Sequence, residues 1–331
     1  MTTTTPVEPV AEPVRAPRLA HLPVTFFATV MGLAGLALAW RKAAAMGAPE
    51  AVSTVIFWIA LAVGAAVALA YAAKIVLHTD AFRAEIRHPV RLAFVPTSTI
   101  ALLLLAAAGR EIVPGPATVL WWLGAVGQVA LTLVVLSAWI SRPTFTSTHV
   151  SPAWFIPVVG LVVVPMAGVD LGPMWLSRFA FWAGMLLWLA LLPIVLQRLF
   201  VHEQPLPAPL LPTLAVLVAP PSAGFLAWTA LNGGTIDVAG EALLDVAVLF
   251  GLLFAALALR LRRLPFFLSW WAFAFPLAAL SAAVTTAAAT QAVAALTVVA
   301  WTLLAAVSAL VLVLAWRTAG AMAAGRICVP E

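Results

Sequence analysis

Long apolar runs, separated by short segments rich in charged residues, proline and glycine, follow one another along almost the whole chain. A helix needs about 20 apolar residues to cross the hydrocarbon core of a bilayer. No alternation of polar and apolar residues typical of strands competes with this pattern. We therefore predict an all-α integral membrane protein with ten spans, at residues 22–40, 52–76, 90–108, 116–140, 153–169, 174–197, 209–231, 242–259, 265–288 and 292–316.

The composition agrees with a membrane protein. Of the 331 residues, 64% are hydrophobic and 9% are charged, whereas about a quarter of the residues of a soluble domain are charged. The net charge of +5 is spread over the connections, which favours topology-setting Lys and Arg over a nucleic-acid surface. We expect a disordered N-terminal tail at residues 1–20, a transmembrane channel domain at 21–317 and a C-terminal tail at 318–331.

Basic residues predict the orientation. Of the 17 lysines and arginines, 13 fall on the side of the two termini, and the other four are Arg41, Lys42, Arg110 and Arg178. Cytoplasmic connections carry the excess of Lys and Arg in membrane proteins. Both termini are therefore expected in the cytoplasm of a protein that spans the cell (inner) membrane many times.

Residues that break helices are shared unevenly among the spans. The third, fifth, seventh and ninth spans carry internal prolines, namely Pro96, Pro157, Pro165, Pro220, Pro221 and Pro276, and the first span has Gly32 and Gly35 in its middle. Of the even-numbered spans, only the sixth has an internal proline, near its cytoplasmic end. Broken helices are tolerated where protein or water satisfies the freed backbone groups. The odd-numbered spans are therefore expected inside and the even-numbered spans outside.

The breaks also recur at a regular distance. Gly32, Pro96, Gly160, Pro220 and Pro276 follow one another at intervals of about 60 residues, the length of one helical hairpin with its loops. This spacing predicts five hairpins in a quasi-five-fold array, with an inner ring of odd-numbered helices around a pore. The alternative is a bundle of ten helices with ordinary proline kinks and no passage.

The stretch Ser269–Leu280 combines a proline with large aromatic rings. Pro276 has no N–H, so the carbonyl of Ala272 loses its helical partner and a kink is expected. Phe275 lies at this bend, where its ring either closes a narrow passage or fills a packed core. Phe273 lies about 200° away around the helix, so only one of these two rings can face the axis.

Candidate chemistry is sparse. The five histidines lie in the tail or in connections, the single cysteine is Cys328, and no metalloprotease, hydrolase or phosphate-loop pattern occurs. We expect no enzyme, no metal and no cofactor. Arg91 is a candidate for the cytoplasmic mouth, although a topology-setting role explains it equally well. The candidate polar groups of a passage are Thr25, Thr29, Thr97, Ser98, Thr99, Ser222 and Ser281, and each can instead bond to its own helix.

The inner spans carry no ionisable residue at mid-membrane depth. A dicarboxylate carrier is expected to hold its substrate with buried Arg or Lys. The absence of such residues favours weak, multi-site passage of a small ion. These considerations leave the sign of the ion open.

Stretches in all five odd-numbered spans resemble the tellurite-resistance/dicarboxylate transporter family, which includes bacterial TehA and the slow anion channels of plant guard cells. The matching stretches are Leu22-Pro23-Val24 with Gly32–Trp40, His88–Val95, Pro152–Gly160, Ala219-Pro220-Pro221 and Trp270–Leu277. Together they cover nearly the whole transmembrane chain.

The resemblance implies a homotrimer with one pore per protomer, which conducts small monovalent anions such as chloride and nitrate. It also implies that Phe275 occludes the pore and that Pro96, Pro165, Pro220 and Pro276 kink the inner helices. The alternative within the same family is a secondary carrier, possibly proton-coupled, for a C4-dicarboxylate, sulfite or tellurite. The guard-cell channels have long terminal regions for phosphorylation, and we do not expect that form of regulation here.

Overall fold

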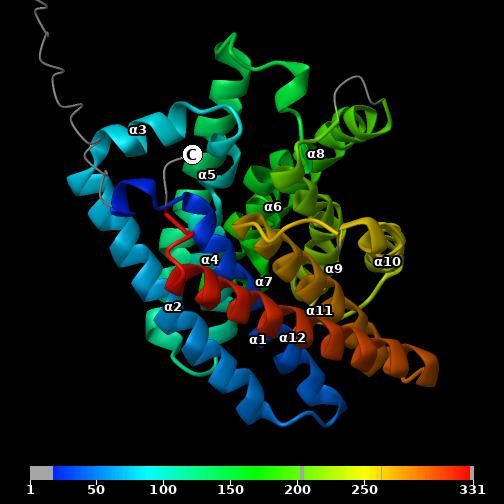
Figure 1. The fold of residues 1–331 in the computed structure, drawn as a ribbon. Coiled ribbons are helices and arrows are strands. Elements are labelled where there is room, and N and C mark those ends of the chain that lie inside the picture. The colour runs from blue at the N-terminus through cyan, green and yellow to red at the C-terminus, as the bar shows by residue number, and fades with distance from the viewer. Residues whose placement is uncertain (1–17, 202–204, 262, 329–331) are drawn as a thin grey trace, which may run out of the picture.

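The computed structural model describes residues 18–201, 205–261 and 263–328, and these contain helices and no strand (Figure 1). Ten of the helical segments are long and apolar enough to cross a membrane, which confirms the predicted all-α, multi-pass architecture. They are Val24–Met46, Glu50–Leu77, Arg91–Gly109, Pro114–Ser141, Pro152–Leu171, Met174–Phe200, Ala208–Leu231, Val238–Ala258, Leu268–Gln291 and Ala294–Ala323.

Each odd-numbered span begins as a 3-10 helix and continues as an α-helix. The pairs are η2 (Val24–Phe26) with α1 (Phe27–Ala43), η4 (Arg91–Phe94) with α4 (Thr97–Gly109), η6 (Pro152–Phe155) with α6 (Ile156–Val163) and α7 (Pro165–Leu171), η7 (Ala208–Val218) with α9 (Ala219–Leu231), and η8 (Leu268–Phe273) with α11 (Ala274–Gln291).

This arrangement differs from the kinks expected inside continuous α-helices. Pro220 and Pro276 lie in the first turns of α9 and α11, and Pro96 directly precedes α4. The N–H groups of a first helical turn have no partner within the helix, so a proline there forfeits no hydrogen bond. The prolines therefore mark the points at which the helix type changes. Pro165 likewise begins α7, and the N–H of Val164 before it donates to the Leu161 carbonyl at 3.2 Å.

The even-numbered spans are continuous α-helices, namely α2 (Glu50–Leu77), α5 (Pro114–Ser141), α8 (Met174–Phe200), α10 (Val238–Leu261) and α12 (Ala294–Ala323). Between the second and third spans lies a short amphipathic helix, α3 (Thr79–Arg87), which the sequence analysis missed. Of the expected tails, residues 1–17 and 329–331 lie outside the described residues. Arg18–His21 forms the 3-10 helix η1, and α12 extends past the predicted end at residue 316.

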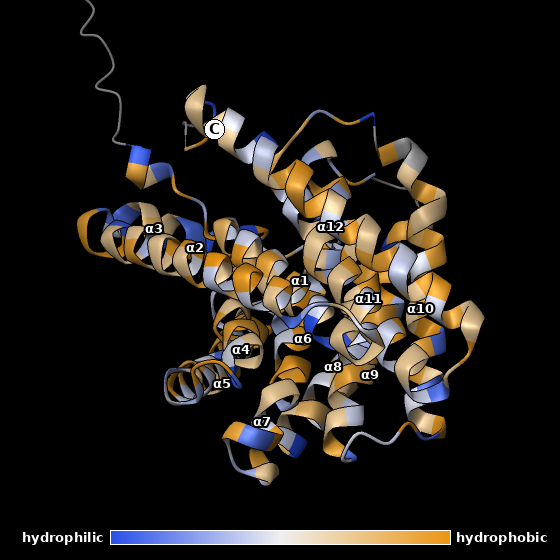
Figure 2. Cartoon of the chain, turned by 90° about the horizontal axis from the view of Figure 1, so that it is seen from below, coloured by the Kyte–Doolittle hydropathy of each residue, from blue (hydrophilic) through white to orange (hydrophobic). Residues whose placement is uncertain are grey.

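Burial alternates along the chain in step with helix type. The odd-numbered spans are 67–83% buried inside the protein, whereas the even-numbered spans are 11–39% buried. Helix α1 packs against α4 and α11, α9 packs against α6, α7 and α11, and α4 packs against α6. Hydrophobic residues cover the outer helices as well as the inner ones, as expected for surfaces that face lipid (Figure 2).

The outer helix α5 supplies hydrogen bonds to the broken fifth span. The side chain of Gln128 is fully buried; its Nε2 donates to the Pro157 carbonyl at 2.7 Å, and its Oε1 accepts from Thr99 Oγ1 at 2.7 Å. Gly160 makes room for this amide, because a Cβ there would lie 2.2 Å from Gln128 Cδ. One side chain of an outer helix thus joins two inner spans.

Trp121, two helical turns before Gln128 on α5, contacts the backbone next to Pro165. Its indole N–H donates to the Val164 carbonyl at 3.0 Å, and its side chain is fully buried. The same carbonyl accepts from the Gly168 N–H at 3.0 Å, so the indole is its second donor. Gly168 and Gly172 accommodate the ring, since a Cβ at either position would lie within 3 Å of it.

A buried ion pair ties α3 to the second span. Lys74 Nζ lies 2.6 Å from Glu85 Oε2, and both side chains are less than 5% exposed. Glu85 also accepts hydrogen bonds from the Val24 N–H at 2.8 Å and from the Tyr71 hydroxyl at 3.0 Å, while Lys74 donates to the Leu22 carbonyl at 2.7 Å. This cluster fixes the segment through which the chain enters its first span.

Replacing Gln128 with leucine is expected to lower the free energy of unfolding by about 1–3 kcal/mol, because in a buried site Thr99 loses one of its two acceptors and the Pro157 carbonyl loses one of its two side-chain donors. Reversible unfolding in mixed micelles measures this. Thr118→Val serves as the control, since Thr118 is a half-buried residue of α5 whose hydroxyl bonds within α5, to the Pro114 carbonyl. Equal stability of the two variants would show that Gln128 does not join the spans.

Candidate functional site

A small apolar chamber lies among the inner spans, towards the end of the bundle where the described chain begins and ends. Its volume is about 40 Å³, which leaves room for a few water molecules. Every odd-numbered span contributes to its lining, which consists of Ala28, Met31, Phe94, Thr97, Ile100, Ile156, Val159, Val216, Ala219, Trp271, Ala272, Phe275 and Pro276.

Phe275 is the aromatic residue of the Phe-Pro pair that lines this chamber, and it is 4% exposed. Its ring lies against α1 at Gly35, where a Cβ would come within 3.3 Å of Phe275 Cδ2. Phe273 points elsewhere, since its ring packs against Phe254 of α10 at 5.3 Å and against Trp270 at 5.5 Å, between ring centroids. The two rings therefore separate as their spacing predicts.

Hydroxyl groups near the chamber are occupied by their own helices. Those of Thr29, Thr97 and Ser98 donate to backbone carbonyls three residues earlier at 2.6–2.8 Å, and that of Ser222 donates to the Val218 carbonyl at 2.7 Å. Thr99 bonds to Pro96 as well as to Gln128. The surface that an ion would meet in the chamber is thus apolar, and apolar constrictions oppose the passage of ions by excluding water.

A second, larger cavity, the charged vestibule, lies at the opposite end of the bundle. Its volume is about 290 Å³. All five odd-numbered spans or their ends line it as well, through Leu38, Lys42, Ala107, Arg110, Met166, Val169, Asp170, Leu226, Thr229, Ala230, Gly233, Gly234, Ala282 and Thr286. The apolar chamber and the charged vestibule share no lining residue.

Of the two basic residues that line the vestibule, Arg110 forms an ion pair and Lys42 forms none with the described residues. Arg110 Nε lies 3.3 Å from Asp170 Oδ2, and its guanidinium also donates to the Met166 carbonyl at 3.0 Å. Arg41 is held by Glu111 at 2.5 Å. Lys42 has no carboxylate within ion-pair distance among the described residues. The vestibule therefore contains an ammonium group that no carboxylate of the described residues pairs with.

A narrow layer separates the two cavities. One helical turn beyond the chamber, the register of the five inner helices places Gly35, Leu104, Val163, Ala223 and Ala279, all of which are buried. The next turn on each helix reaches the vestibule, so chamber and vestibule are about 10 Å apart along α11. Leu104 and Val163 are the bulky members of this layer, and the ring of Phe275 lies against Gly35, another member of it.

The remaining predicted site residues have different positions. Pro276 lines the apolar chamber, whereas Pro96, Pro165 and Pro220 are buried at the starts of their α-helices and line neither cavity. Arg91 is exposed at the beginning of η4, one turn from Phe94 of the chamber. Its assignment to a mouth stays a prediction.

The sequence analysis treated Lys42, Arg110 and Asp170 as residues of connections and gave them no role at a site. A signal was present, because all three fall at the same ends of the first, third and fifth spans. Spans of one direction that surround one axis bring such residues together.

These features define a multi-pass helical membrane protein whose buried, odd-numbered spans together line a cavity at each end of the bundle. Comparison with known families gives the same class. The sequence model of the SLAC1 family, described as voltage-dependent anion channel, matches residues 21–319, and the chain belongs to this family.

Named relatives include both transporters and channels. The chain is 32% identical over 233 residues to an uncharacterized transporter of Methanocaldococcus jannaschii, an alignment that covers 63% of this chain and 66% of that protein. It is 28% identical to the tellurite resistance protein TehA homolog of Haemophilus influenzae, covering 80% of each. It is also 28% identical to the S-type anion channel SLAH2 of Arabidopsis thaliana, covering 81% of this chain and 53% of the channel. The chain thus spans just under two thirds of the archaeal protein and about half of the plant one.

Gly32 allows α1 and α11 to approach closely, since a Cβ there would lie 2.6 Å from Ala274 Cβ. Gly32→Ala is expected to lower the free energy of unfolding by about 1–3 kcal/mol through overpacking. Adding Ala274→Gly removes the clashing atom and is expected to restore part of the loss. Thermal unfolding in detergent measures both variants, and a stable single variant or an unrescued double variant would contradict the close contact.

Proposed function

We propose that this protein is an anion channel in which the odd-numbered spans surround a pore, with the even-numbered spans shielding them from lipid. The observation that carries the proposal is that all five odd-numbered spans contribute to both the apolar chamber and the charged vestibule. The chain of contacts from α1 through α4, α6, α9 and α11 back to α1 supports a closed arrangement. The substrate class is a small monovalent anion such as chloride or nitrate.

The charged vestibule supports the sign of the ion. It carries the ammonium group of Lys42 and the guanidinium of Arg110, against the carboxylate of Asp170. Cations in a cleft with apolar walls raise the local concentration of anions. The inner spans offer no buried Arg or Lys between chamber and vestibule that would hold an anion tightly, so passage is weak and rapid. The names of the plant relatives as anion channels agree with this conclusion.

Phe275 is the residue to which we assign the closure of the pore. It lines the apolar chamber, and Gly35 leaves space for its ring on α1. A change of its side-chain rotamer alters the width of the passage without a movement of the backbone. The change of helix type between Phe273 and Ala274, just before it, sets the position from which the ring projects.

The distribution of basic residues supports an orientation with both termini in the cytoplasm. In that orientation the apolar chamber and Arg91 lie towards the cytoplasm, and the charged vestibule lies towards the outside. The reaction is transport through the membrane without covalent chemistry.

Replacing Phe275 with alanine is expected to raise anion conductance on the order of tenfold, equivalent to lowering the barrier by about 1.4 kcal/mol. The current is measured in planar bilayers with purified protein. Phe273→Ala is the matched control, because Phe273 packs against α10 and does not line the chamber. An unchanged current in the Phe275 variant, or an equal rise in the Phe273 variant, would remove Phe275 from the gate.

The same preparation tests the carrier alternative. Ion-substitution reversal potentials identify the permeant ions of a channel. Saturable, pH-driven uptake of a dicarboxylate or of sulfite without a measurable current would instead favour a secondary carrier.

Reversing the charge of Lys42 is expected to reduce the preference for anions over cations, because the vestibule loses its unpaired ammonium group and gains a carboxylate. Reversal potentials in a salt gradient measure the preference for Lys42→Glu. The effect should fade as salt rises, since the Debye length falls from about 10 Å at 0.1 M to about 3 Å at 1 M.

Arg178→Glu is the control for charge at the same end of the bundle. Arg178 is exposed near the start of the outer helix α8 and does not line the vestibule. An equal change of selectivity in the two variants would mean that overall charge, and not the vestibule, sets the preference.

A further inference from the structure

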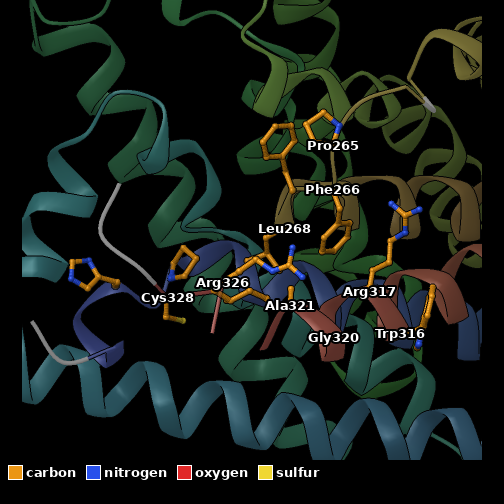
Figure 3. Close-up of a pocket in the computed structure, with 13 residues that line it drawn as sticks. Pro265, Phe266, Leu268, Trp316, Arg317, Gly320, Ala321, Arg326 and Cys328 are labelled. Carbon is orange, nitrogen blue, oxygen red and sulfur yellow. The ribbon is translucent and has the colours of Figure 1, made fainter. Parts of the chain in front are cut away.

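A cavity of about 740 Å³, here called the terminal cavity, opens at the end of the bundle where the described chain begins and ends (Figure 3). Three parts of the chain enclose it: the entry to the first span, the segment that leads into η8, and the end of α12 with the residues that follow. The terminal cavity is separate from the apolar chamber and shares no lining residue with it.

The charges of the terminal cavity have one sign. Arg317 and Arg326 line it, and in Figure 3 they lie on either side of Phe266. His21 adds a ring nitrogen, Nε2, which is buried and has no hydrogen-bond partner among the described residues. None of the 13 lining residues is Asp or Glu. An anion that enters the cavity thus meets several donors and no carboxylate.

The rest of the lining is apolar and lies beside the lipid. Phe266, Leu268 and Ile327 contribute apolar side chains. Trp316 is 74% exposed on α12, an outer helix that is 28% buried. Exposed tryptophan at the end of a span is typical of the boundary between hydrocarbon and headgroups. The cavity is therefore open to a molecule that lies partly in the bilayer.

From these observations we propose that the terminal cavity binds a phosphate-bearing amphiphile, with the phosphate on Arg317 and Arg326 and the apolar part against Phe266 and Trp316. Guanidinium groups match phosphate oxygens in pairs of charge-assisted hydrogen bonds. Basic pockets between spans at the cytoplasmic surface bind lipid headgroups. The source of the phosphate is either an anionic phospholipid of the adjacent leaflet or a soluble phosphate ester.

Two tryptophans of the ninth span, Trp270 and Trp271, connect the terminal cavity to that span. The guanidinium of Arg317 lies over the ring of Trp270, 5.6 Å from its centroid, and the indole N–H of Trp270 donates to the Pro265 carbonyl. The indole N–H of Trp271 donates to Thr318 Oγ1 at 2.9 Å, and Trp271 also lines the apolar chamber. A phosphate that draws Arg317 away from Trp270 therefore acts on the segment that carries Phe275.

Native mass spectrometry of the full-length protein tests the site directly. The protein is released from phosphatidylcholine nanodiscs with and without phosphatidylglycerol, and bound lipid is counted. Retention of phosphatidylglycerol is expected in the unaltered protein, with affinity lower on the order of tenfold in the double variant Arg317→Gln/Arg326→Gln. Arg263→Gln, an exposed arginine outside the cavity, is the control and should retain the lipid.

A second variant distinguishes binding inside the cavity from attraction of lipid to surface charge alone. A Cβ at Gly320 meets nothing within 4 Å, so Gly320→Leu is expected to fold normally and to fill the floor of the cavity with all cations in place. Loss of bound lipid in this variant supports the site. Full retention there, an equal loss in the Arg263 variant, or no preference for phosphatidylglycerol over phosphatidylcholine would overturn it.

Competition decides between the two sources of phosphate. If glycerol 3-phosphate displaces the lipid, a soluble ester suffices for binding; if it does not, the acyl chains are required. Because lipid retention is read without any ion current, failure of the site and failure of the proposed channel function are distinguishable. Flux in liposomes with and without phosphatidylglycerol then measures the coupling to the ninth span.

Discussion

A backbone carbonyl that loses its helical hydrogen-bond donor inside a membrane cannot be satisfied by water, so another protein group must donate to it. In this protein the odd-numbered spans change helix type within the bilayer, and side chains of the outer helix α5 donate hydrogen bonds to two backbone carbonyls of the irregular fifth span. Gln128 reaches the Pro157 carbonyl, and Trp121 reaches the Val164 carbonyl. The irregular spans can exist because smooth helices surround them, and the burial of the two classes follows from this dependence.

The same constraint explains the choice of small residues where spans meet. Gly32 and Gly35 let α11 lie close to α1, and Gly160 makes room for the Gln128 amide. Lipid offers no hydrophobic drive for helices to associate, so close backbone approach and interhelical hydrogen bonds provide the attraction. Glycines of the outer spans serve the same purpose, since a Cβ at Gly124 would lie 2.8 Å from Leu103 Cγ and one at Gly184 would lie 2.7 Å from Val162 Cγ2.

Hydropathy and proline placement predicted the number of spans and their alternation in burial, and also most of their bounds to within about four residues, but the first and tenth spans end at Met46 and Ala323 instead of at the predicted residues 40 and 316. They did not predict features that depend on contacts with residues far away in the sequence. The 3-10 segments were invisible because a proline can either kink a helix or start one, and only the packed neighbours of Pro220 and Pro276 decide. Helix α3 was missed because Thr79–Arg87 is charged and short, and its stability depends on the contacts of Glu85 with Lys74 and with the Val24 N–H.

The spacing of Phe273 and Phe275 allowed only one of these two rings to face the chamber, but the choice between them required the position of Phe254. The charged vestibule needed knowledge of which span ends meet.

The buried pair of Lys74 and Glu85 has a consequence for biogenesis. When α2 leaves the ribosome, its lysine enters the edge of the bilayer before the glutamate, 11 residues later, has emerged. Until then the ammonium group must extend towards the headgroups, and the Leu22 carbonyl lacks the donor that later holds the entry of the first span. We expect the first two spans to settle only after α3 emerges. The smallest unit of insertion is then a hairpin together with the amphipathic helix that follows it. The third span inserts next to α3, which already lies at the membrane surface.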